Sequence, residues 1–370
     1  MEYRRLRVII SGGGTGGHIF PALSIAEKLK EVNPETEILF VGAEGRMEME
    51  KVPAAGYRII GLPVAGLQRR LTMSNLALPF KVIKSVSMAK KIIRDFKPDI
   101  AIGVGGYASA PLLWAAGRLG IPTLIQEQNG FAGLTNRILG KSAARICTAY
   151  EGMERFFPAE RIVMTGNPIR KDIVPGTADM KAEGYSFYGL DPEKKHIFIV
   201  GGSLGSGTLN RAMMKWIEDG RPGGEGIEVI WQCGKYYKKT VDAFMSEREV
   251  PGIQAFDFIQ RMDLAYAVAD VVISRSGASS VSELCAAHKA VIFVPSPNVT
   301  EDHQTHNAMA LVNRYAAMIV TDSEAENRLM NTACRLLDEP ARIALLERNI
   351  AALARTDASM DIVKEIYQII

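Results

Sequence analysis

The sequence of 370 residues is poor in cysteine and has no long apolar run. Its four cysteines, Cys147, Cys233, Cys285 and Cys334, are scattered and form no CxxC pair. A disulfide framework and a cysteine-based zinc site are therefore disfavoured, and a reducing compartment is expected. No stretch approaches the roughly 18 apolar residues of a membrane-spanning helix. The start, MEYRRLRVII, lacks the apolar core and cleavage site of a secretory signal, so secretion is not expected either.

Paired carboxylates that could hold a metal-bound nucleotide are also missing after the predicted strands. His303 and His306 stand three apart in EDHQTHNA, but no third ligand for zinc is evident. We therefore expect no metal site, and we expect phosphates to be bound by backbone dipoles instead. In this stretch Gln304 and Asn307 are candidates for reading sugar hydroxyls.

The composition is that of a folded globular protein, with 47% hydrophobic and 23% charged residues. The length predicts two domains. The net charge of +3 is unevenly distributed. Residues 1–167 hold 22 basic and 14 acidic residues, whereas the remainder holds 22 and 27. The first half is therefore a candidate to meet an anionic partner, although chance explains the imbalance equally well.

Short β-rich runs alternate with helical segments in both halves. RVIIS, EILFVGA, DIAIGVGG, PTLIQEQ and RICTA are predicted strands of the first half, and the pattern restarts at HIFIVGG. Such alternation is typical of βαβ units with a parallel sheet. The stretch TGNPIRKDIVPG, residues 165–176, is the predicted junction. The expected fold class is α/β, with two Rossmann-like doubly wound domains facing each other across a cleft.

The glycine-rich stretch SGGGTGGH, residues 11–18, directly follows the first predicted strand. Amide groups at the start of the following helix attract anions, and glycine lets a phosphate approach the backbone. Gly12, Gly14 and Gly17 satisfy the G-x-G-x-x-G pattern, which leaves an NAD(P)-dependent oxidoreductase open. The acidic residue that such an enzyme needs about 20 positions on is missing, because Glu44 lies 32 residues beyond Gly12. His18 ends the loop and can take a proton near neutral pH.

Two further loops follow predicted strands in the second half. GGSLG, residues 201–205, fits the G-x-S-x-G elbow of hydrolases with Ser203 as nucleophile, but no clear acid and histidine partners follow. A second phosphate-binding loop suits the repeated architecture better. SRSGASSVSE, residues 274–283, offers hydroxyls and amides for a diphosphate, and Glu283 can accept hydrogen bonds from ribose hydroxyls.

A basic segment with apolar residues covers positions 66–97. Eight cations stand against one acid, Asp95. The exposed part is expected between Leu76 and Lys84, where an anionic membrane surface could be contacted by Leu76, Leu78, Phe80, Lys81 and Lys84. Part of the segment must also be an ordinary helix packed on the sheet. Nucleic acid is not the expected partner, since aromatic residues are few here and the second half is acidic.

Seven strings follow one another in order between residues 8 and 312: GGTGGHIFPALSIA, GVGGYASAPLLWAA, QEQNGFAGLTNRIL, GNPIR, VGGSLG, RSGASSVSE and DHQTHNA. Together they resemble the MurG family of peptidoglycan N-acetylglucosaminyltransferases, in glycosyltransferase family 28. The resemblance implies a GT-B architecture, with domains at 1–167 and 168–353 and a C-terminal helix at about 354–370 that packs back on the first domain. The first domain would take the acceptor and the membrane, and the second would bind UDP-GlcNAc.

The implied reaction transfers GlcNAc, with inversion, from UDP-GlcNAc to the C4 hydroxyl of MurNAc(pentapeptide)-diphosphoundecaprenol, that is, lipid I to lipid II. No metal or other cofactor is implied. The implied place is the cytoplasmic face of the bacterial inner membrane, as a peripheral enzyme of cell-wall synthesis, cell shape and cell division. Cell-wall synthesis or division proteins are implied partners. A non-catalytic nucleotide-sugar-binding protein is a further alternative.

The resemblance also assigns roles to single residues. The implied donor-binding residues are Thr15, Gly16, Gly17, Asn129, Arg170, Ser203, Ile259, Ala278, Ser279, Ser280, Val281, Ser282, Glu283 and Gln304. Ile259 would meet the uracil through its backbone. The implied acceptor-binding residues are Gly14, Tyr107 and Asn129, near the catalytic candidates His18 and Glu127.

This sequence departs from the family before the EQN triplet, where the family often has histidine and this chain has Gln126. Glutamine cannot accept the proton, so His18 is favoured as the general base, with Glu127 as its rival. The acceptor's diphosphate is expected on the loop at 11–18.

Overall fold

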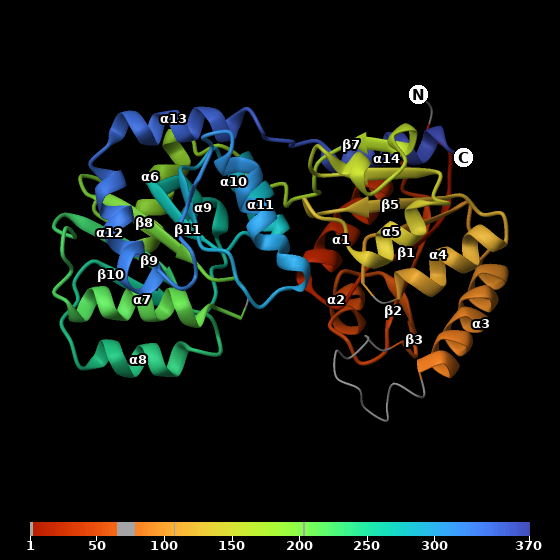
Figure 1. Ribbon diagram of the computed structural model, residues 1–370, viewed down its shortest axis with the longest axis horizontal. Coiled ribbons are helices and arrows are strands. Elements are labelled where there is room, and N and C mark those ends of the chain that lie inside the picture. The colour runs from red at the N-terminus through yellow and green to blue at the C-terminus, as the bar shows by residue number, and fades with distance from the viewer. Residues whose placement is uncertain (1–2, 65–77, 107, 203) are drawn as a thin grey trace. The chain divides into compact units, whose positions relative to one another are not determined.

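The computed structural model describes residues 3–64, 78–106, 108–202 and 204–370, with the backbone alone at 78–81 and 300. The chain divides into two compact units. Unit 1 comprises Met1–Ile169 and Thr356–Ile370, and unit 2 comprises Arg170–Arg355. Each unit is a parallel β-sheet with helices on both faces (Figure 1). The predicted pair of doubly wound α/β domains is therefore confirmed.

The sheet of unit 1 has the strand order β3-β2-β1-β4-β5-β6-β7, and all neighbouring strands are parallel. The strands are β1 (Arg7–Ser11), β2 (Glu37–Ala43), β3 (Arg58–Leu62), β4 (Ile100–Gly103), β5 (Thr123–Glu127), β6 (Arg145–Thr148) and β7 (Ile162–Met164). In the centre of this sheet, Ile9 of β1 pairs with Leu39 of β2 and with Ala101 of β4. The first strand therefore lies between the second and the fourth.

Two groups of helices cover the two faces of this sheet. They are α1 (Gly16–Val32), α2 (Glu48–Ala54), α3 (Leu78–Phe96), α4 (Ser109–Arg118), α5 (Leu134–Gly140) and α14 (Ala358–Gln368). Val8 and Ile10 pack with α1 and α14, whereas Ile9 points to the opposite face, toward α3, α4 and α5. This alternation is that of a strand buried on both faces.

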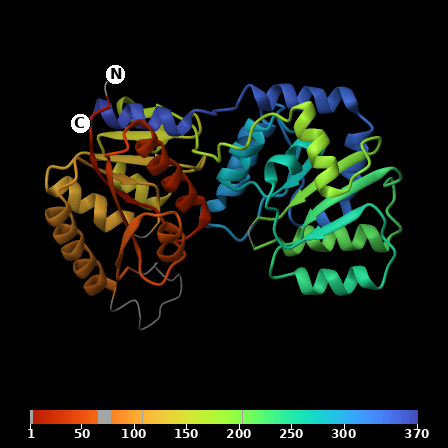
Figure 2. The same cartoon turned by 180° about the vertical axis from the view of Figure 1, so that it is seen from behind.

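The C-terminal helix α14 belongs to unit 1 although it follows all of unit 2 in the chain. It packs beside α1, and the red and blue helices lie together in Figure 1. From behind, α1 is seen lying across the strands (Figure 2). An ion pair of 2.8 Å between Arg145 of β6 and Glu365 also ties α14 to the sheet.

The sheet of unit 2 has the order β10-β9-β8-β11-β12-β13, again all parallel. Its strands are β8 (Lys195–Val200), β9 (Ile227–Gln232), β10 (Ile253–Phe256), β11 (Val271–Ser274), β12 (Val291–Phe293) and β13 (Met318–Ile319). Its helices are α6 (Ala178–Tyr188), α7 (Gly207–Glu218), α8 (Lys238–Ser246), α9 (Met262–Val268), α10 (Ala278–Ala286), α11 (His303–Val312), α12 (Ala325–Leu337) and α13 (Pro340–Ala351). Ile197 and Ile199 of β8 pack with α7 and α12, while Phe198 lies on the other face, 5.6 Å from the ring of Tyr266 in α9.

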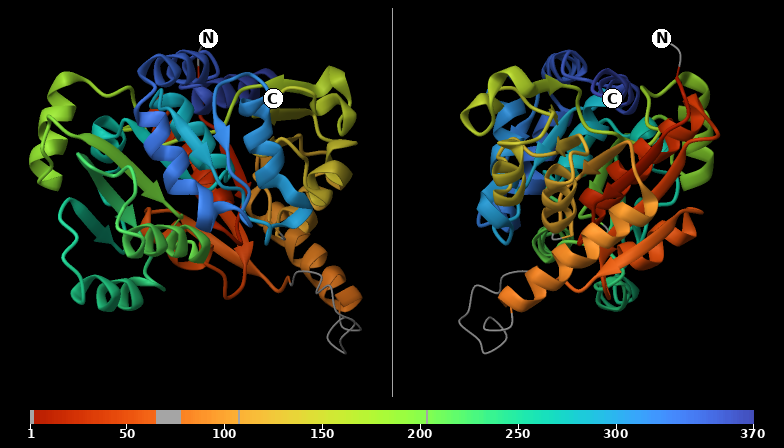
Figure 3. Two further views of the ribbon diagram at one scale, coloured as in Figure 1. Left: turned by 60° about the vertical axis from the view of Figure 1, so that its left-hand side comes forward. Right: turned by 90° about the vertical axis from the view of Figure 1, so that its right-hand side faces the viewer.

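No helix in the described part of the chain is long and apolar enough to cross a bilayer. The helix α3 packs beside α4 and lies on the outside of unit 1 (Figures 1 and 3). All four cysteines are free and buried.

Candidate active site

Each sheet contains one point at which the chain changes the side on which it adds strands. In unit 1 the chain builds β2 and β3 on one side of β1 and then places β4 on the other side. In unit 2 the same reversal occurs between β8 and β11. The loops that leave the carboxyl ends of two such strands diverge to opposite faces and leave a crevice, which is where doubly wound folds bind ligands. The three loops identified in the sequence follow β1, β8 and β11, and a further loop with Gly105 and Gly106 follows β4.

His18 lies in the first turn of α1 and is held by the loop before it. Its Nδ1 is 3.0 Å from the carbonyl oxygen of Gly13 and 3.4 Å from Oγ1 of Thr15. A carbonyl oxygen only accepts hydrogen bonds, so Nδ1 carries a proton and donates it to Gly13. In the neutral ring the basic lone pair is consequently on Nε2.

The loop after β4 packs directly against this histidine. A Cβ atom on Gly105 would lie 2.8 Å from His18 Nε2, and one on Gly106 would lie 2.4 Å from the carbonyl oxygen of Gly13. Both glycines have positive φ angles, 97° and 92°. Glycine is therefore required at both positions by conformation and by space. Ser109 links the ends of the two loops, since its Oγ donates to the carbonyl oxygens of Ser11 and Gly105.

Glu127 ends β5 and is 2% exposed. One carboxylate oxygen accepts from the backbone N–H and the side-chain amide of Asn129, at 3.1 and 3.4 Å. The other accepts from the backbone N–H of Gly133 and from Nδ2 of Asn136, at 3.2 and 2.8 Å. Burial raises the pKa of Glu127, and these four hydrogen bonds oppose the rise. The carboxylate therefore organises the loop from β5 to α5, which carries Asn129.

Gln126, at the departure from the family pattern, is fully buried. Its Nε2 donates to Oδ1 of Asn167 at 2.9 Å, and its side-chain oxygen accepts from Nε2 of Gln128. Gln128 also donates to the carbonyl oxygen of Val104, at the end of β4. The residue at this position is thus part of a buried amide network behind the loops.

In unit 2 the loop after β8 is shaped by close backbone packing. Gly205 has a φ of 80°, and a Cβ atom on it would lie 2.1 Å from the carbonyl oxygen of Cys233. The side chain of Gln232 fixes the start of the loop, because it accepts from the N–H of Gly201 at 2.9 Å and donates to the carbonyl oxygen of Gly202 at 2.8 Å. The loop leads into the N-terminus of α7, where Ser206 caps the N–H of Leu209.

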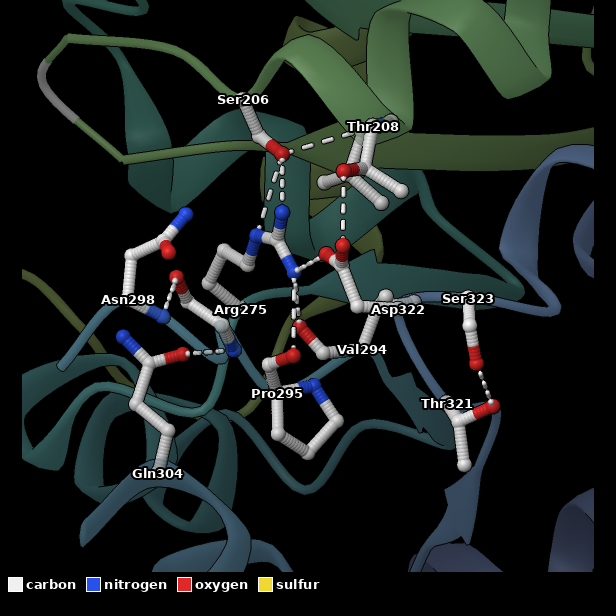
Figure 4. Close-up of polar contacts among 12 residues, drawn as sticks. Ser206, Thr208, Arg275, Val294, Pro295, Asn298, Gln304, Thr321, Asp322 and Ser323 are labelled. Carbon is white, nitrogen blue, oxygen red and sulfur yellow. Dashed lines mark hydrogen bonds and ion pairs between the residues drawn. The ribbon is translucent and has the colours of Figure 1, made fainter. Parts of the chain in front are cut away.

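Arg275, directly after β11, joins the two loops of this crevice (Figure 4). Its Nε and Nη2 donate to Oγ of Ser206 at 3.0 and 2.7 Å. Its Nη1 donates to Oδ1 of Asp322 at 2.6 Å and to the carbonyl oxygens of Val294 and Pro295. Asp322 also accepts from Oγ1 of Thr208, at 3.1 Å. The guanidinium therefore fixes the start of α7 relative to β11 and β12.

Arg275 and Asp322 are not among the site residues predicted from the sequence. For Arg275, the available signal was its position directly after the mostly apolar run VVIS, since a guanidinium there has five N–H donors for the neighbouring loops. Asp322 carried no comparable signal, since only the fold brings it to Arg275.

The helix α10 begins at Ala278, so that Ala278, Ser279 and Ser280 form its first turn, with Val281 buried and Ser282 bonded back to the carbonyl oxygen of Ala278. One turn further on, Glu283 has a side chain that is 15% exposed. It accepts from Nε of Arg170 at 3.3 Å and from the hydroxyl of Tyr266 at 3.4 Å. Burial raises the pKa of Glu283, and the Arg170 guanidinium opposes that rise.

Gln304 lies in the first turn of α11, and Ile259 lies between β10 and α9. Oε1 of Gln304 accepts from the N–H of Ser296 at 2.8 Å (Figure 4). The backbone carbonyl oxygen of Gln304 accepts from Oγ of Ser276 at 2.9 Å. Ile259 is 3% exposed, whereas Phe258 beside it is 58% exposed. Gln304 therefore links the loops after β11 and β12.

In unit 1, Gly14, Thr15 and Gly17 are exposed and Gly16 is partly exposed at the start of α1. Tyr107, Ser203 and Leu76 lie outside the described residues, as do the side chains of Leu78, Phe80 and Lys81. Lys84 is exposed on α3. Within the part of the chain that the structure covers, no group of three or more His, Cys, Asp or Glu side chains could hold a metal ion.

Two doubly wound units with glycine loops at their switch points are the architecture of GT-B glycosyltransferases. The chain matches the glycosyltransferase family 28 N-terminal domain over residues 8–148 and the glycosyltransferase family 28 C-terminal domain over residues 196–366. It therefore belongs to glycosyltransferase family 28, and the predicted fold class, enzyme class and family resemblance are confirmed.

Relatives of full length support this assignment. A protein of Parabacteroides distasonis is 53% identical over 99% of both chains, and one of Cytophaga hutchinsonii is 52% identical over 100% of this chain and 98% of its own. Both are named UDP-N-acetylglucosamine–N-acetylmuramyl-(pentapeptide) pyrophosphoryl-undecaprenol N-acetylglucosamine transferase. The crystal structure of Acinetobacter baumannii MurG matches with a TM-score of 0.80 and 29% identity, over 98% of this chain and 99% of that chain.

Proposed function

We propose that this protein transfers GlcNAc, with inversion, from UDP-GlcNAc to the C4 hydroxyl of MurNAc(pentapeptide)-diphosphoundecaprenol in peptidoglycan synthesis. The observation that carries the proposal is the identity of about half of all residues, over the full length, with relatives named for this reaction. Family membership replaces the oxidoreductase and hydrolase interpretations of the glycine patterns.

The donor binds to unit 2 in this account. The starts of α7 and α10 meet at the switch point between β8 and β11, and each offers backbone N–H groups without an intrahelical acceptor. The UDP diphosphate is held there, by the loop containing Ser203 and by Ala278 to Ser282. No metal is needed in this arrangement, since the helix ends and Arg170 supply positive potential for the leaving UDP.

The remaining donor contacts come from side chains already fixed by the fold. Glu283 accepts the ribose hydroxyls, because each carboxylate oxygen can accept more than the one bond it makes to Arg170 or Tyr266. The backbone of Ile259 reads the uracil. Gln304, whose Oε1 is already engaged by Ser296, has its amide N–H₂ to donate to GlcNAc.

The acceptor binds to unit 1, at the loops after β1, β4 and β5. His18 Nε2 takes the proton of the C4 hydroxyl as the hydroxyl oxygen attacks the anomeric carbon and the bond to UDP breaks. Thr15, Gly16, Gly17 and Asn129 contact the transferred sugar, and Gly14 and Tyr107 the acceptor. We assign Glu127 to positioning Asn129, since its carboxylate is buried and used within its own loop.

The lipid part of the acceptor requires a membrane contact, which we assign to the face of unit 1 formed by α3, α4 and α5. Exposed apolar side chains on this face are Val82, Ile83, Trp114, Leu134 and Ile138, which are 43–67% exposed. Cations accompany them, with Lys90 and Arg118 stacked on the Trp114 ring at 5.5 and 5.1 Å. Apolar residues among cations are typical of binding to an anionic leaflet.

Replacing Ile83 by glutamate is expected to weaken binding to phosphatidylglycerol-containing vesicles by about tenfold or more, because a buried isoleucine contributes about 1.5–3 kcal/mol. Sedimentation with vesicles measures the change. Tyr315→Glu, at a site on unit 2 that is 75% exposed where Ile83 is 67% exposed, should leave binding unchanged. Equal binding to pure phosphatidylcholine vesicles at all salt concentrations would contradict the electrostatic part.

Asp322→Asn is expected to raise the KM for UDP-GlcNAc by about tenfold with little change in kcat. The substitution removes the ionic acceptor of Arg275, and hydrogen bonds to charged groups contribute roughly 1.5–3 kcal/mol. Steady-state kinetics at varied donor measure the effect. Glu326→Gln is the control, because it breaks an exposed ion pair between Arg211 of α7 and Glu326 of α12. A lower kcat at unchanged KM would show that Asp322 does not act on the donor.

The proposed reaction is tested by transfer of labelled GlcNAc from UDP-GlcNAc to a lipid I analogue. Saturable formation of a disaccharide product is expected. If the protein binds UDP-GlcNAc but transfers no GlcNAc to this acceptor, it is either a non-catalytic nucleotide-sugar-binding protein or an enzyme for a different acceptor.

A further inference from the structure

A buried carboxylate in unit 1 has no part in the function proposed above. Glu48, the first residue of α2, is 1% exposed. Its Oε1 accepts from the backbone N–H of Ala43 at 3.0 Å, and its Oε2 accepts from the backbone N–H of Gly14 at 2.9 Å. The carboxylate thus reaches from α2 into the loop that precedes His18.

The two bonds at this loop belong to one peptide group. The N–H of Gly14 and the carbonyl of Gly13 are the two ends of the same planar amide. Its N–H donates to Glu48, while its oxygen accepts from Nδ1 of His18 at 3.0 Å. A carboxylate, a peptide and an imidazole are consequently connected in series.

Space fixes this peptide as well. A Cβ atom on Gly13 would lie 2.2 Å from Oε1 of Glu48, and one on Gly42 would lie 2.6 Å from its Cγ. The Glu48 side chain therefore fills the volume beside the loop. Rotation of the peptide would break both of its hydrogen bonds and would leave a buried carboxylate oxygen without its donor, which is costly.

We propose that Glu48 is a positioning residue that acts on His18 through the Gly13–Gly14 peptide. The carboxylate holds the peptide so that its oxygen faces Nδ1, which fixes the Nδ1–H tautomer and keeps the basic lone pair on Nε2. The bond to a carboxylate also polarises the peptide and strengthens its bond to the imidazole, because hydrogen bonds in series reinforce one another. The inference rests on the proposed role of His18 as general base.

A double-mutant cycle tests the connection. Glu48→Gln keeps the size of the side chain but places an N–H₂ donor against one of the two backbone N–H groups. It should lower kcat about 10–100-fold, the cost typical of losing a group that orients a functional histidine. The KM for UDP-GlcNAc should stay within about twofold, and in a His18→Gln background Glu48→Gln should cost less than about twofold further. Glu50→Gln, an exposed glutamate of the same helix, is the matched control and should change neither parameter.

The outcomes separate the proposed role of His18 as general base from the proposed positioning role of Glu48. A wild-type kcat in His18→Gln would overturn the base assignment and the role of Glu48 with it. A large loss in His18→Gln, with no loss in Glu48→Gln or the same loss in both backgrounds, would overturn only the role of Glu48.

The tautomer gives a readout that needs no variant of Glu48. In protein labelled with ¹⁵N-histidine, the resonances of His18 are assigned by their loss in His18→Gln, among five histidines. Neutral His18 should carry its proton on Nδ1, and Glu48→Gln should increase the Nε2–H form. An Nε2–H tautomer in the wild type would contradict the inference, even if Glu48→Gln did not fold.

Discussion

His18→Gln is expected to lower kcat at saturating UDP-GlcNAc by about 10²–10⁴-fold, the contribution typical of a positioned general base. The KM for the donor should change little, because most donor contacts are assigned to unit 2. The physical reason is the location of the lone pair: with Nδ1–H donated to Gly13, the neutral ring can receive the hydroxyl proton on Nε2. Glutamine keeps a polar side chain but cannot take that proton.

His288→Asn is the control for this loss. His288 lies between α10 and the amino end of β12, away from the loops at the carboxyl ends of the strands. Its φ is positive, 55°, which asparagine tolerates. Its kcat should equal that of the wild type. A kcat for His18→Gln within about twofold of the wild type would remove general base catalysis by His18 from the mechanism.

Glu283→Gln is expected to raise the KM for UDP-GlcNAc about 10–100-fold, since hydrogen bonds to an ionised group contribute roughly 1.5–3 kcal/mol. A donor with 2′-deoxyribose in place of ribose should show the same loss with the wild type and little further loss with the variant. Asp172→Asn, which breaks a longer and more exposed contact with Arg170 at 3.9 Å, should stay within about twofold. If Glu283→Gln still bound the deoxy donor much more weakly than UDP-GlcNAc, the ribose hydroxyls would have to bind to other residues.

The same carboxylate predicts a pH dependence. Burial raises the pKa of Glu283 above its usual value, with Arg170 opposing the rise. Only the ionised carboxylate can accept from both ribose hydroxyls, so donor affinity should fall as the pH drops through this raised pKa. The decline should therefore begin at a higher pH than for an ordinary glutamate, and Glu283→Gln should show no such decline.

Most of the fold could be predicted because its strands are buried on both faces. RVIIS and EILFVGA coincide with β1 and β2, whose cores are unbroken apolar runs. β3 (Arg58–Leu62) and β7 (Ile162–Met164) were not identified. Both form edges of the sheet, and their residues are mostly half-buried, unlike those of a central strand.

The candidate site was also predictable only in part. The glycine loops and His18 could be located from sequence, because they must follow strands and begin helices. The partners of their polar groups could not, since Glu48 and Asp322 are brought to the loops only by the order of the strands. Glu127 shows the difference, because the sequence offers a carboxylate after a strand, whereas its four hydrogen bonds reveal that the loop uses it.

A crystal structure of the protein with UDP-GlcNAc tests the central claim most directly. We expect the diphosphate within hydrogen-bonding distance of the backbone amides at the starts of α7 and α10, with the ribose hydroxyls on Glu283. A nucleotide bound to the loop between β1 and α1, with the loops after β8 and β11 unoccupied, would contradict it.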